Sequence, residues 1–282
     1  MRERISFISV LTMFLAIGFV IIFSRPVKAA ANGVILKSNR TYAAYAVTGD
    51  GMKDKIRIRA ANQTDDEAYS SLTVSVNGKT AYRLKNTRFY NVIANIYTLK
   101  NGQPFLYLYA PAENGDGPVC ALLKYTNGKF RKILDFTEIM AGYGDHRIGE
   151  VTNLNGNKIV ITESIVSYSL GINAINFTYK YVNGKFVPTS RYGSYKEIYS
   201  ADGSSRHFTV SSDLPAYTRP GATAVNTTLK TGSLTKIIKC ALINRKMYIQ
   251  LECDGEIYWI KALENPPISD NERQFMEVRY AG

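Results

Sequence analysis

Two nearly identical stretches, YTNGKF at residues 125–130 and YVNGKF at residues 181–186, decide the fold of this 282-residue chain. A weaker copy, VSVNGKTAY, lies at residues 74–82. Asn-Gly accepts the positive φ angles that tight hairpin turns need, and each pair follows an alternating run of β-branched and aromatic residues. The sequence therefore predicts three β-hairpins, one at each Asn-Gly pair.

The surroundings of the three hairpins recur as well. An earlier strand precedes each hairpin, read as KDKIRIRA, QPFLYLYA and GNKIVITE, and a glycine turn and another apolar segment precede that strand. Each unit thus has four strands, repeated three times over residues 38–193, which is typical of propeller blades. The sequence predicts an all-β fold with a propeller-like repeat domain over residues 30–200, and an irregular β-sandwich is the alternative. Because closed propellers have about four to eight blades, three units form either an open array or one completed by another domain or copy.

The first unit carries a family resemblance. TGDGMKDKIRI, at residues 48–58, resembles the start of an FG-GAP or VCBS repeat, in which an Asp/Asn-rich loop often binds calcium between the first two strands of a blade. Asp50 and Asp54 match the second half of that loop, whereas Ala46 and Thr48 replace the residues that open it. The resemblance implies one calcium candidate, at Asp50 and Asp54, with turn chemistry as the alternative role. No other cofactor is expected.

The N-terminus reads as a secretory signal peptide. Two arginines precede an apolar stretch, and a small-residue site ends it, so cleavage is expected after Ala29 and the signal peptide spans residues 1–29. An uncleaved membrane anchor is the alternative, because the apolar run is near spanning length. No later segment is apolar enough to span, so no membrane contact is expected after cleavage. The expected location is extracellular, free or associated with the cell wall.

The charge of the chain indicates an anionic partner. The net charge is +12, and the signal segment carries +3 of it, which leaves +9 for the rest. A basic exported protein usually meets anionic polymer, and export argues against nucleic acid. The alternative is an ordinary solvated surface, because the charge is spread along the chain without a basic run.

The cysteines indicate little disulfide chemistry. The chain has three cysteines, an odd number, at Cys120, Cys240 and Cys253. A tight turn at Asn244-Arg245 would place Ile249, not Cys253, opposite Cys240, so free, buried thiols are expected. An exported protein this poor in disulfides fits a Gram-positive source.

The C-terminal part has a second resemblance. Residues 206–264 are similar to a bacterial Src-homology-3-like domain, and eight positions match its pattern: Leu214, Tyr217, Gly221, Leu229, Gly232, Tyr248, Gly255 and Trp259. The resemblance implies a small β-barrel, which in relatives often binds cell-wall peptides or glycan. Trp259 and Tyr217 are the candidate ligand-binding residues, and a core or groove-wall role is the alternative. Residues 265–282 are expected to pack back on both domains, either as a short helix capped by Ser269 or as a strand.

Motifs for catalysis are absent from the sequence. There are two histidines, and His146 stands in YGDHRIG, which reads as a surface loop. No nucleophile elbow, zinc-spaced histidine pair or phosphate-cradling loop occurs. A carboxylate pair for glycoside hydrolysis needs to meet only in space, so a secreted glycan-active enzyme with an unmarked pair is the alternative function.

Tyrosine is abundant, with 20 residues, and stacks on sugars or builds protein-binding surfaces when exposed. The candidates for exposure lie near unit edges, at Tyr42, Tyr45, Tyr90, Tyr97, Tyr143 and Tyr168. Taken together, the sequence predicts an exported, non-enzymatic binding protein. Its expected partner is a cell-wall polymer, another anionic extracellular polymer or glycan, or a surface protein.

Overall fold

A computed structural model describes residues 33–64, 67–113, 115–200, 203 and 206–279. The predicted signal peptide, residues 1–29, lies outside these residues. The described chain is all-β, as the sequence predicts, and consists of antiparallel sheets with two short 3₁₀ turns. Within it, no helix has the length and apolar character that crossing a membrane requires.

Three sheets follow the three repeated units. The first sheet has the order β2 (Thr41–Tyr45), β3 (Asp54–Gln63), β4 (Tyr69–Val76) and β5 (Lys79–Phe89). The second has β1 (Gly33–Leu36) beside β6 (Ile93–Thr98), then β7 (Pro104–Ala110), β8 (Val119–Thr126) and β9 (Lys129–Asp135). The third begins with β10 (Gly144–Asn155), β11 (Lys158–Ser167) and β12 (Gly171–Val182), and β13 (Lys185–Pro188) pairs with β12. Each sheet therefore contains four strands that are consecutive in the chain.

The Asn-Gly hairpins are confirmed. At all three turns the asparagine φ lies between +48° and +50° and the glycine φ between +79° and +83°, which is the geometry of a two-residue hairpin turn. The turn at Asn244-Arg245 has positive φ at both residues and places Ile249 opposite Cys240. The three cysteines are free and buried, as expected.

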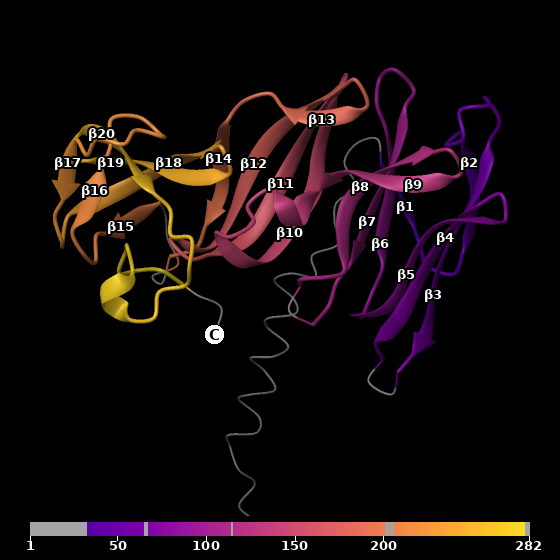
Figure 1. Ribbon diagram of the computed structural model, residues 1–282, viewed down its shortest axis with the longest axis horizontal. Helices are drawn as coiled ribbons and strands as arrows, with labels where there is room; N and C mark the ends of the chain where they lie inside the picture. The colour runs from indigo at the N-terminus through magenta and orange to yellow at the C-terminus, as the bar shows by residue number, and fades with distance from the viewer. Residues whose placement is uncertain (1–32, 65–66, 114, 201–202, 204–205, 280–282) are drawn as a thin grey trace, which may run out of the picture.

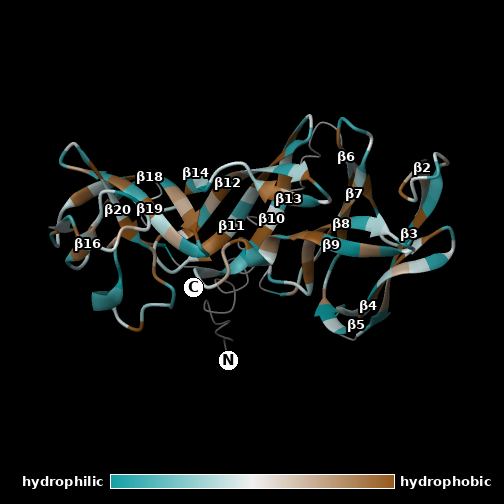
Figure 2. Cartoon of the chain, turned by 45° about the horizontal axis from the view of Figure 1, so that its top comes forward, coloured by the Kyte–Doolittle hydropathy of each residue, from teal (hydrophilic) through white to brown (hydrophobic). Residues whose placement is uncertain are grey.

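The second sheet is covered on both of its faces. One face, which includes Leu106 and Leu108, packs with Ile58 and Leu72 of the first sheet. The opposite face carries Tyr97, Phe105, Tyr107 and Cys120 and joins the core that extends into the third sheet. The three sheets stand in a row along the molecule (Figure 1), and hydrophobic and hydrophilic residues alternate along their strands (Figure 2). This stacking leaves the first sheet with one face toward solvent.

The six tyrosines that the sequence predicts to be exposed are buried or half-buried in this stack. Tyr97 and Tyr143 are only 2 % and 4 % exposed, and the other four candidates are half-buried. Tyr97 faces the third sheet, where its hydroxyl donates to the Val151 carbonyl at 3.4 Å. A residue at the edge of a repeat in the sequence is thus not at an edge in space.

The third sheet continues into the C-terminal strands. β14 (Tyr192–Ile198) pairs with both β12 and β18 (Leu234–Ile243), and β19 (Lys246–Cys253) and β20 (Glu256–Lys261) follow. β15 (His207–Thr209) pairs with β18, while β16 (Leu214–Ala216) and β17 (Thr227–Leu229) form a separate ribbon. In the described chain no sheet closes into a barrel. The nine-stranded sheet instead crosses the position where the sequence places a domain boundary.

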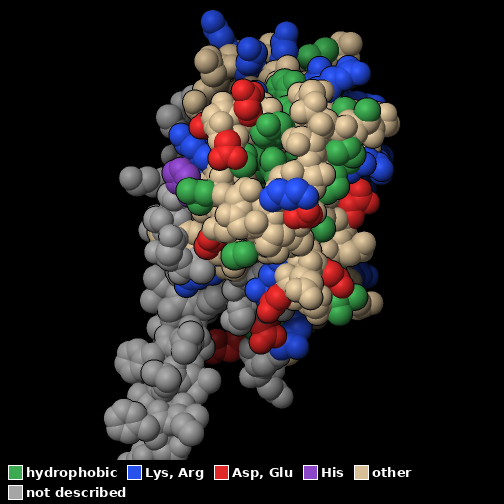
Figure 3. All heavy atoms as spheres, turned by 90° about the vertical axis from the view of Figure 1, so that its left-hand side faces the viewer, with side chains coloured by type: hydrophobic (Ala, Val, Ile, Leu, Met, Phe, Trp, Pro, Cys, Tyr) green, Lys and Arg blue, Asp and Glu red, His purple; other side chains and the backbone are tan. Residues whose placement is uncertain are grey.

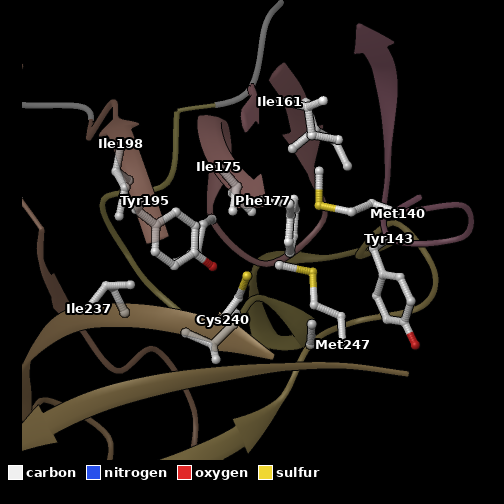
Figure 4. Close-up of a cluster of buried hydrophobic side chains, with 14 of the residues drawn as sticks. Met140, Tyr143, Ile161, Ile175, Phe177, Tyr195, Ile198, Ile237, Cys240 and Met247 are labelled. Atoms are coloured by element: carbon white, nitrogen blue, oxygen red, sulfur yellow. The ribbon is translucent and has the colours of Figure 1, made fainter. Parts of the chain in front are cut away.

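One hydrophobic core accompanies this continuous sheet. Phe177 and Tyr195 from the third sheet lie beside Cys240 and Met247 from β18 and β19, all of them buried (Figure 4). Tyr143, from the segment before β10, joins the same group (Figure 4). The C-terminal strands therefore share their interior with the repeat units.

The C-terminal segment, residues 265–279, packs against the third repeat unit and against the strands that follow it. Val278 forms an antiparallel bridge with Ser200 and Phe275 forms one with Val210, while the Arg279 carbonyl accepts the Ile172 N–H at 3.0 Å. The expected helix is only a 3₁₀ turn, η2 (Asp270–Glu272), and the Ser269 side chain does not cap it. The other 3₁₀ turn, η1 (Phe136–Glu138), follows β9.

Candidate functional site

In the predicted calcium loop, the aspartate carboxylates already accept hydrogen bonds from neighbouring protein groups. Asp54 is 1 % exposed, and its carboxylate accepts the Thr48 N–H at 2.8 Å, the Thr48 hydroxyl and the Asn77 side-chain amide at 2.6 Å. Asp50 accepts the Met52 N–H at 2.8 Å. Among the described residues, no group of three or more His, Cys, Asp or Glu side chains could hold a metal ion. Calcium needs six to eight oxygen ligands, so this arrangement favours turn chemistry for both aspartates.

Trp259 and Tyr217, the predicted ligand-binding residues, lie side by side. Their backbones form an isolated bridge, with hydrogen bonds of 2.8 and 2.9 Å between β20 and the end of β16. Both side chains are buried, at 4 % and 6 % exposed, and pack with Tyr248. They therefore form the floor of a surface and not an open stacking platform.

Cations cover the aromatic rings above that floor. The Lys239 ammonium lies 4.6 Å from the ring centre of Tyr192 and 5.9 Å from that of Trp259, and the Lys261 ammonium lies 5.1 Å from that of Tyr217. Tyr192 is 38 % exposed, and its ring also lies 5.5 Å from the Arg191 guanidinium. We call this surface the Trp259 face, defined by Arg191, Tyr192, Tyr217, Lys239, Trp259 and Lys261. Because the cations occupy the ring faces, the surface presents positive charge to a ligand.

A larger site lies on the solvent face of the first sheet, where the sequence placed no candidate. Alternate residues of β3 and β5 point outward there, while their neighbours fill the core. We call this surface the basic face. Its five cations are all exposed: Lys55, Arg57, Arg59, Arg83 and Lys85.

The basic face has cationic walls and a hydroxyl floor. Thr73 of β4 pairs with Arg59 on one side and with Arg83 on the other, and Ser71 likewise faces Lys85. Neighbouring strands are about 4.8 Å apart, so the two rows of cations start about 9.6 Å apart across β4. A groove of about 420 Å³ follows this course, lined by Arg59, Ala61, Asn62, Ser70, Ser71, Thr73, Arg83, Lys85 and Asn86.

The charges on this face have a single sign. The outward positions of β2 to β5 carry cations, hydroxyl groups, side-chain amides and alanine, and none of them is acidic in the described chain. The ion pairs between described residues lie elsewhere, for example Lys132 with Asp135 and Lys230 with Asp213. The groove is therefore built to attract an anion.

A β-bulge in β5 assembles this face. Ser75 pairs with Thr80, but Val74 pairs with Tyr82, so Ala81 is an extra residue in the strand. Without it, the two-residue turn would place Arg83 and Lys85 on the core side, because side chains alternate along a strand. The alternation in KIRIRA is visible in the sequence, whereas the bulge that adds the second row of cations is not.

The candidate for an unmarked carboxylate site lies around His146. The Asp116 carboxylate accepts the backbone N–H groups of His146 and Arg147, at 3.3 and 3.0 Å, and Asp145 accepts the Tyr168 hydroxyl at 3.2 Å. His146 lies within β10, at a register irregularity, with a φ of +52°, where the sequence predicted a surface loop. Asp116 therefore supports the irregular backbone and Asp145 holds a tyrosine hydroxyl, so the arrangement does not favour the enzymatic alternative.

A buried acidic group lies between the second and third sheets. Glu163 is fully buried, neither carboxyl oxygen has a hydrogen-bond partner among the described residues, and burial raises its pKa well above the usual range. A methyl group at Gly149 would collide with the Glu163 carboxyl and with the Phe136 ring. Nearby, the Tyr107 hydroxyl donates to the Gly149 carbonyl at 2.8 Å. The site is closed and has no route for a polymer, so we regard it as part of the fold.

Comparisons with protein-family models, curated proteins and solved structures found no match to this chain.

Proposed function

We propose that this chain is an exported, non-enzymatic binding protein whose ligand is an anionic polymer of the cell wall, held on the basic face. The observation that carries the proposal is the groove in which two rows of cations flank a strand of hydroxyl side chains. The predicted signal peptide supplies the route to the wall. The net charge of +9 that remains after signal-peptide cleavage acts in the same direction, because it raises the local concentration of anions.

A solubilising role alone does not account for the basic face. The first sheet ends the stack, and an end unit needs a polar outer face to stay soluble. Mixed charges would meet that need without the mutual repulsion of cations that stand about 6.7 Å apart along β3. Five cations without an acid among the described residues of the face thus fit an anionic partner better than a cap.

The chemistry of the groove suits phosphate. Arg59 and Arg83 offer planar guanidinium donors, which match phosphate oxygens in pairs, and the Thr73 hydroxyl between them offers a further donor. Cations recur at every second residue along β3, about 6.7 Å apart. A linear polymer that lies along β4 would therefore meet several cations in succession. We propose a phosphodiester polymer as the ligand.

The fold supports two finer proposals. We propose that the three sheets are propeller-like blades, which the consecutive four-strand order and the shared Asn-Gly turns support. We also propose that residues 206–264 are a Src-homology-3-like domain that stays open toward the third sheet. The bridge between Tyr217 and Trp259, which links the first and last matching strands, supports this relation.

The test is binding of the purified protein to poly(glycerol phosphate) at low and high salt. We expect binding that weakens with salt, because exposed charges are screened. The Arg59→Gln/Arg83→Gln variant should lose at least tenfold in affinity, since each charge-assisted hydrogen bond contributes roughly 1.5–3 kcal/mol. The Lys100→Gln/Lys185→Gln variant makes the same change of net charge at exposed lysines outside the groove, and we expect at most a threefold loss.

Three outcomes would overturn the proposal. An equal loss in both variants would mean that only net charge matters. Tighter binding to single-stranded DNA than to the wall polymer would change the class of ligand. Shortening of the polymer during incubation, followed by mass spectrometry, would show turnover and favour the glycan-active enzyme.

A further inference from the structure

We infer that the Trp259 face is a second, independent site for phosphodiester polymer, so that one molecule bridges two polymer segments. The inference rests on the proposed function, because it assigns the same class of ligand to a different surface. Its evidence is separate, and consists of the cation–aromatic geometry of β14, β18 and β20 and of the place of these strands in the molecule.

The cations of the Trp259 face are held in place before any ligand arrives. Lys239 is half-buried and stands over two rings, and Lys261 stands over Tyr217. A lysine on open surface loses much of its side-chain entropy when it binds. Contact with a ring restricts the side chain in advance and thereby reduces that cost.

The cross-strand neighbours of these cations are neutral. Lys239 pairs with Ser194 on β14 and with Gln250 on β19, and Lys261 pairs with Tyr248. Gln250 in turn faces Trp259. The nearest acidic residue on the same side of β19 is Glu252, two residues beyond Gln250. It pairs with Ile257 on β20 and with Lys236 on β18. The cations thus remain available to an anion from outside.

The rest of this end of the molecule sets the expected strength. Viewed from the end, hydrophobic side chains gather in the upper part of this face (Figure 3). Lys and Arg side chains lie around and below them, and acidic side chains are interspersed over the same face (Figure 3). The Trp259 face has three cations, fewer than the five of the basic face. We therefore expect weaker binding at this site than at the basic face.

The two sites lie at opposite ends of the molecule. The first sheet is at one end of the long axis, β18 to β20 are near the other, and the second sheet and β10 to β13 lie between them (Figure 1). A short anion can occupy only one site at a time. A long polymer, or two polymers, can occupy both, and each molecule then acts as a cross-link whose overall affinity exceeds that of either site.

The test combines a short and a long polyanion at low ionic strength. Calorimetry with tripolyphosphate should show two anions bound per protein, at unequal affinities. Light scattering with long-chain polyphosphate should rise to a maximum and fall again in excess polymer, when each site holds a separate chain. We expect Lys239→Gln/Lys261→Gln and Arg59→Gln/Arg83→Gln each to lose one tripolyphosphate site and the scattering maximum. Lys100→Gln/Lys185→Gln should keep both.

The outcomes separate this inference from the proposed function. One anion per protein, lost only in Arg59→Gln/Arg83→Gln, would overturn the second site and leave the basic face. One anion lost only in Lys239→Gln/Lys261→Gln would overturn the basic face and the bridging together. Near-ultraviolet circular dichroism checks that the variants are folded. Lys239→Arg/Lys261→Arg keeps the charge, and its failure to retain the second anion would show that charge is not what binds.

Discussion

At the scale of single residues, Glu163 provides the sharpest prediction. Its side chain is fully buried, burial raises its pKa, and the repulsion from Asp135 adds to this, while Arg147 acts in the opposite direction. A carboxyl whose pKa is raised in the folded state stabilises the protein at low pH, and that contribution is lost as pH rises above the ordinary pKa. Glu163→Gln keeps the shape and removes the charge. We expect its Tm to exceed that of the unchanged protein at pH 8 and the difference to vanish near pH 4.

The measurement is a series of thermal melts between pH 4 and pH 9. Glu256→Gln is the matched control, because Glu256 is exposed at the start of β20. A Tm difference for Glu163→Gln that stays constant across this range would show that the pKa of this carboxyl is the same in the folded and unfolded states, and would contradict the prediction.

At the scale of elements, the hairpin turns are where stability depends on backbone conformation alone. Gly128 and Gly184 have φ of +79° and +83°, and nothing lies within 4 Å of the position that a Cβ would take. Alanine would therefore strain the backbone without a collision, and we expect Gly128→Ala and Gly184→Ala each to cost about 1 kcal/mol in the free energy of unfolding.

Urea unfolding measures this cost. The control is Lys185→Ala, at the exposed residue after the Asn183-Gly184 turn. Its free energy of unfolding should stay within about 0.5 kcal/mol of that of the unchanged protein. Binding of poly(glycerol phosphate) should be unchanged in both glycine variants, because the turns lie outside both faces. Full stability with lost binding would identify the turns as recognition loops.

Local elements could be predicted from the sequence because their causes are local. Asn-Gly sets the three turns, and Asn244-Arg245 sets the register that places Ile249 opposite Cys240. The site could not be predicted in the same way. The bulge at Ala81 decides which side of β5 faces solvent, and the stacking of whole sheets decides that Tyr97 is buried.

At the scale of the whole molecule, the second sheet connects two cores. One of its faces packs with the first sheet, and the other joins the core that reaches β19. β14 further connects the third sheet to β18 by backbone hydrogen bonds. Residues at the two ends of the molecule are therefore linked through continuous packing, although the sequence pattern changes near residue 206.

This continuity predicts that the chain unfolds as one unit, which Trp259 can report. It is the only tryptophan, lies in β20 and is 4 % exposed, so its fluorescence follows the C-terminal strands. Ile58 is fully buried in the first sheet, and Ile58→Ala should cost about 2–5 kcal/mol. In urea, we expect the variant to shift the midpoint of tryptophan fluorescence as much as that of far-ultraviolet circular dichroism.

Ile237→Ala, in β18, is the matched substitution on the C-terminal side and should also move both midpoints together. If Ile58→Ala leaves the fluorescence midpoint in place, the C-terminal strands fold independently, and the boundary expected from the sequence is real despite the shared sheet.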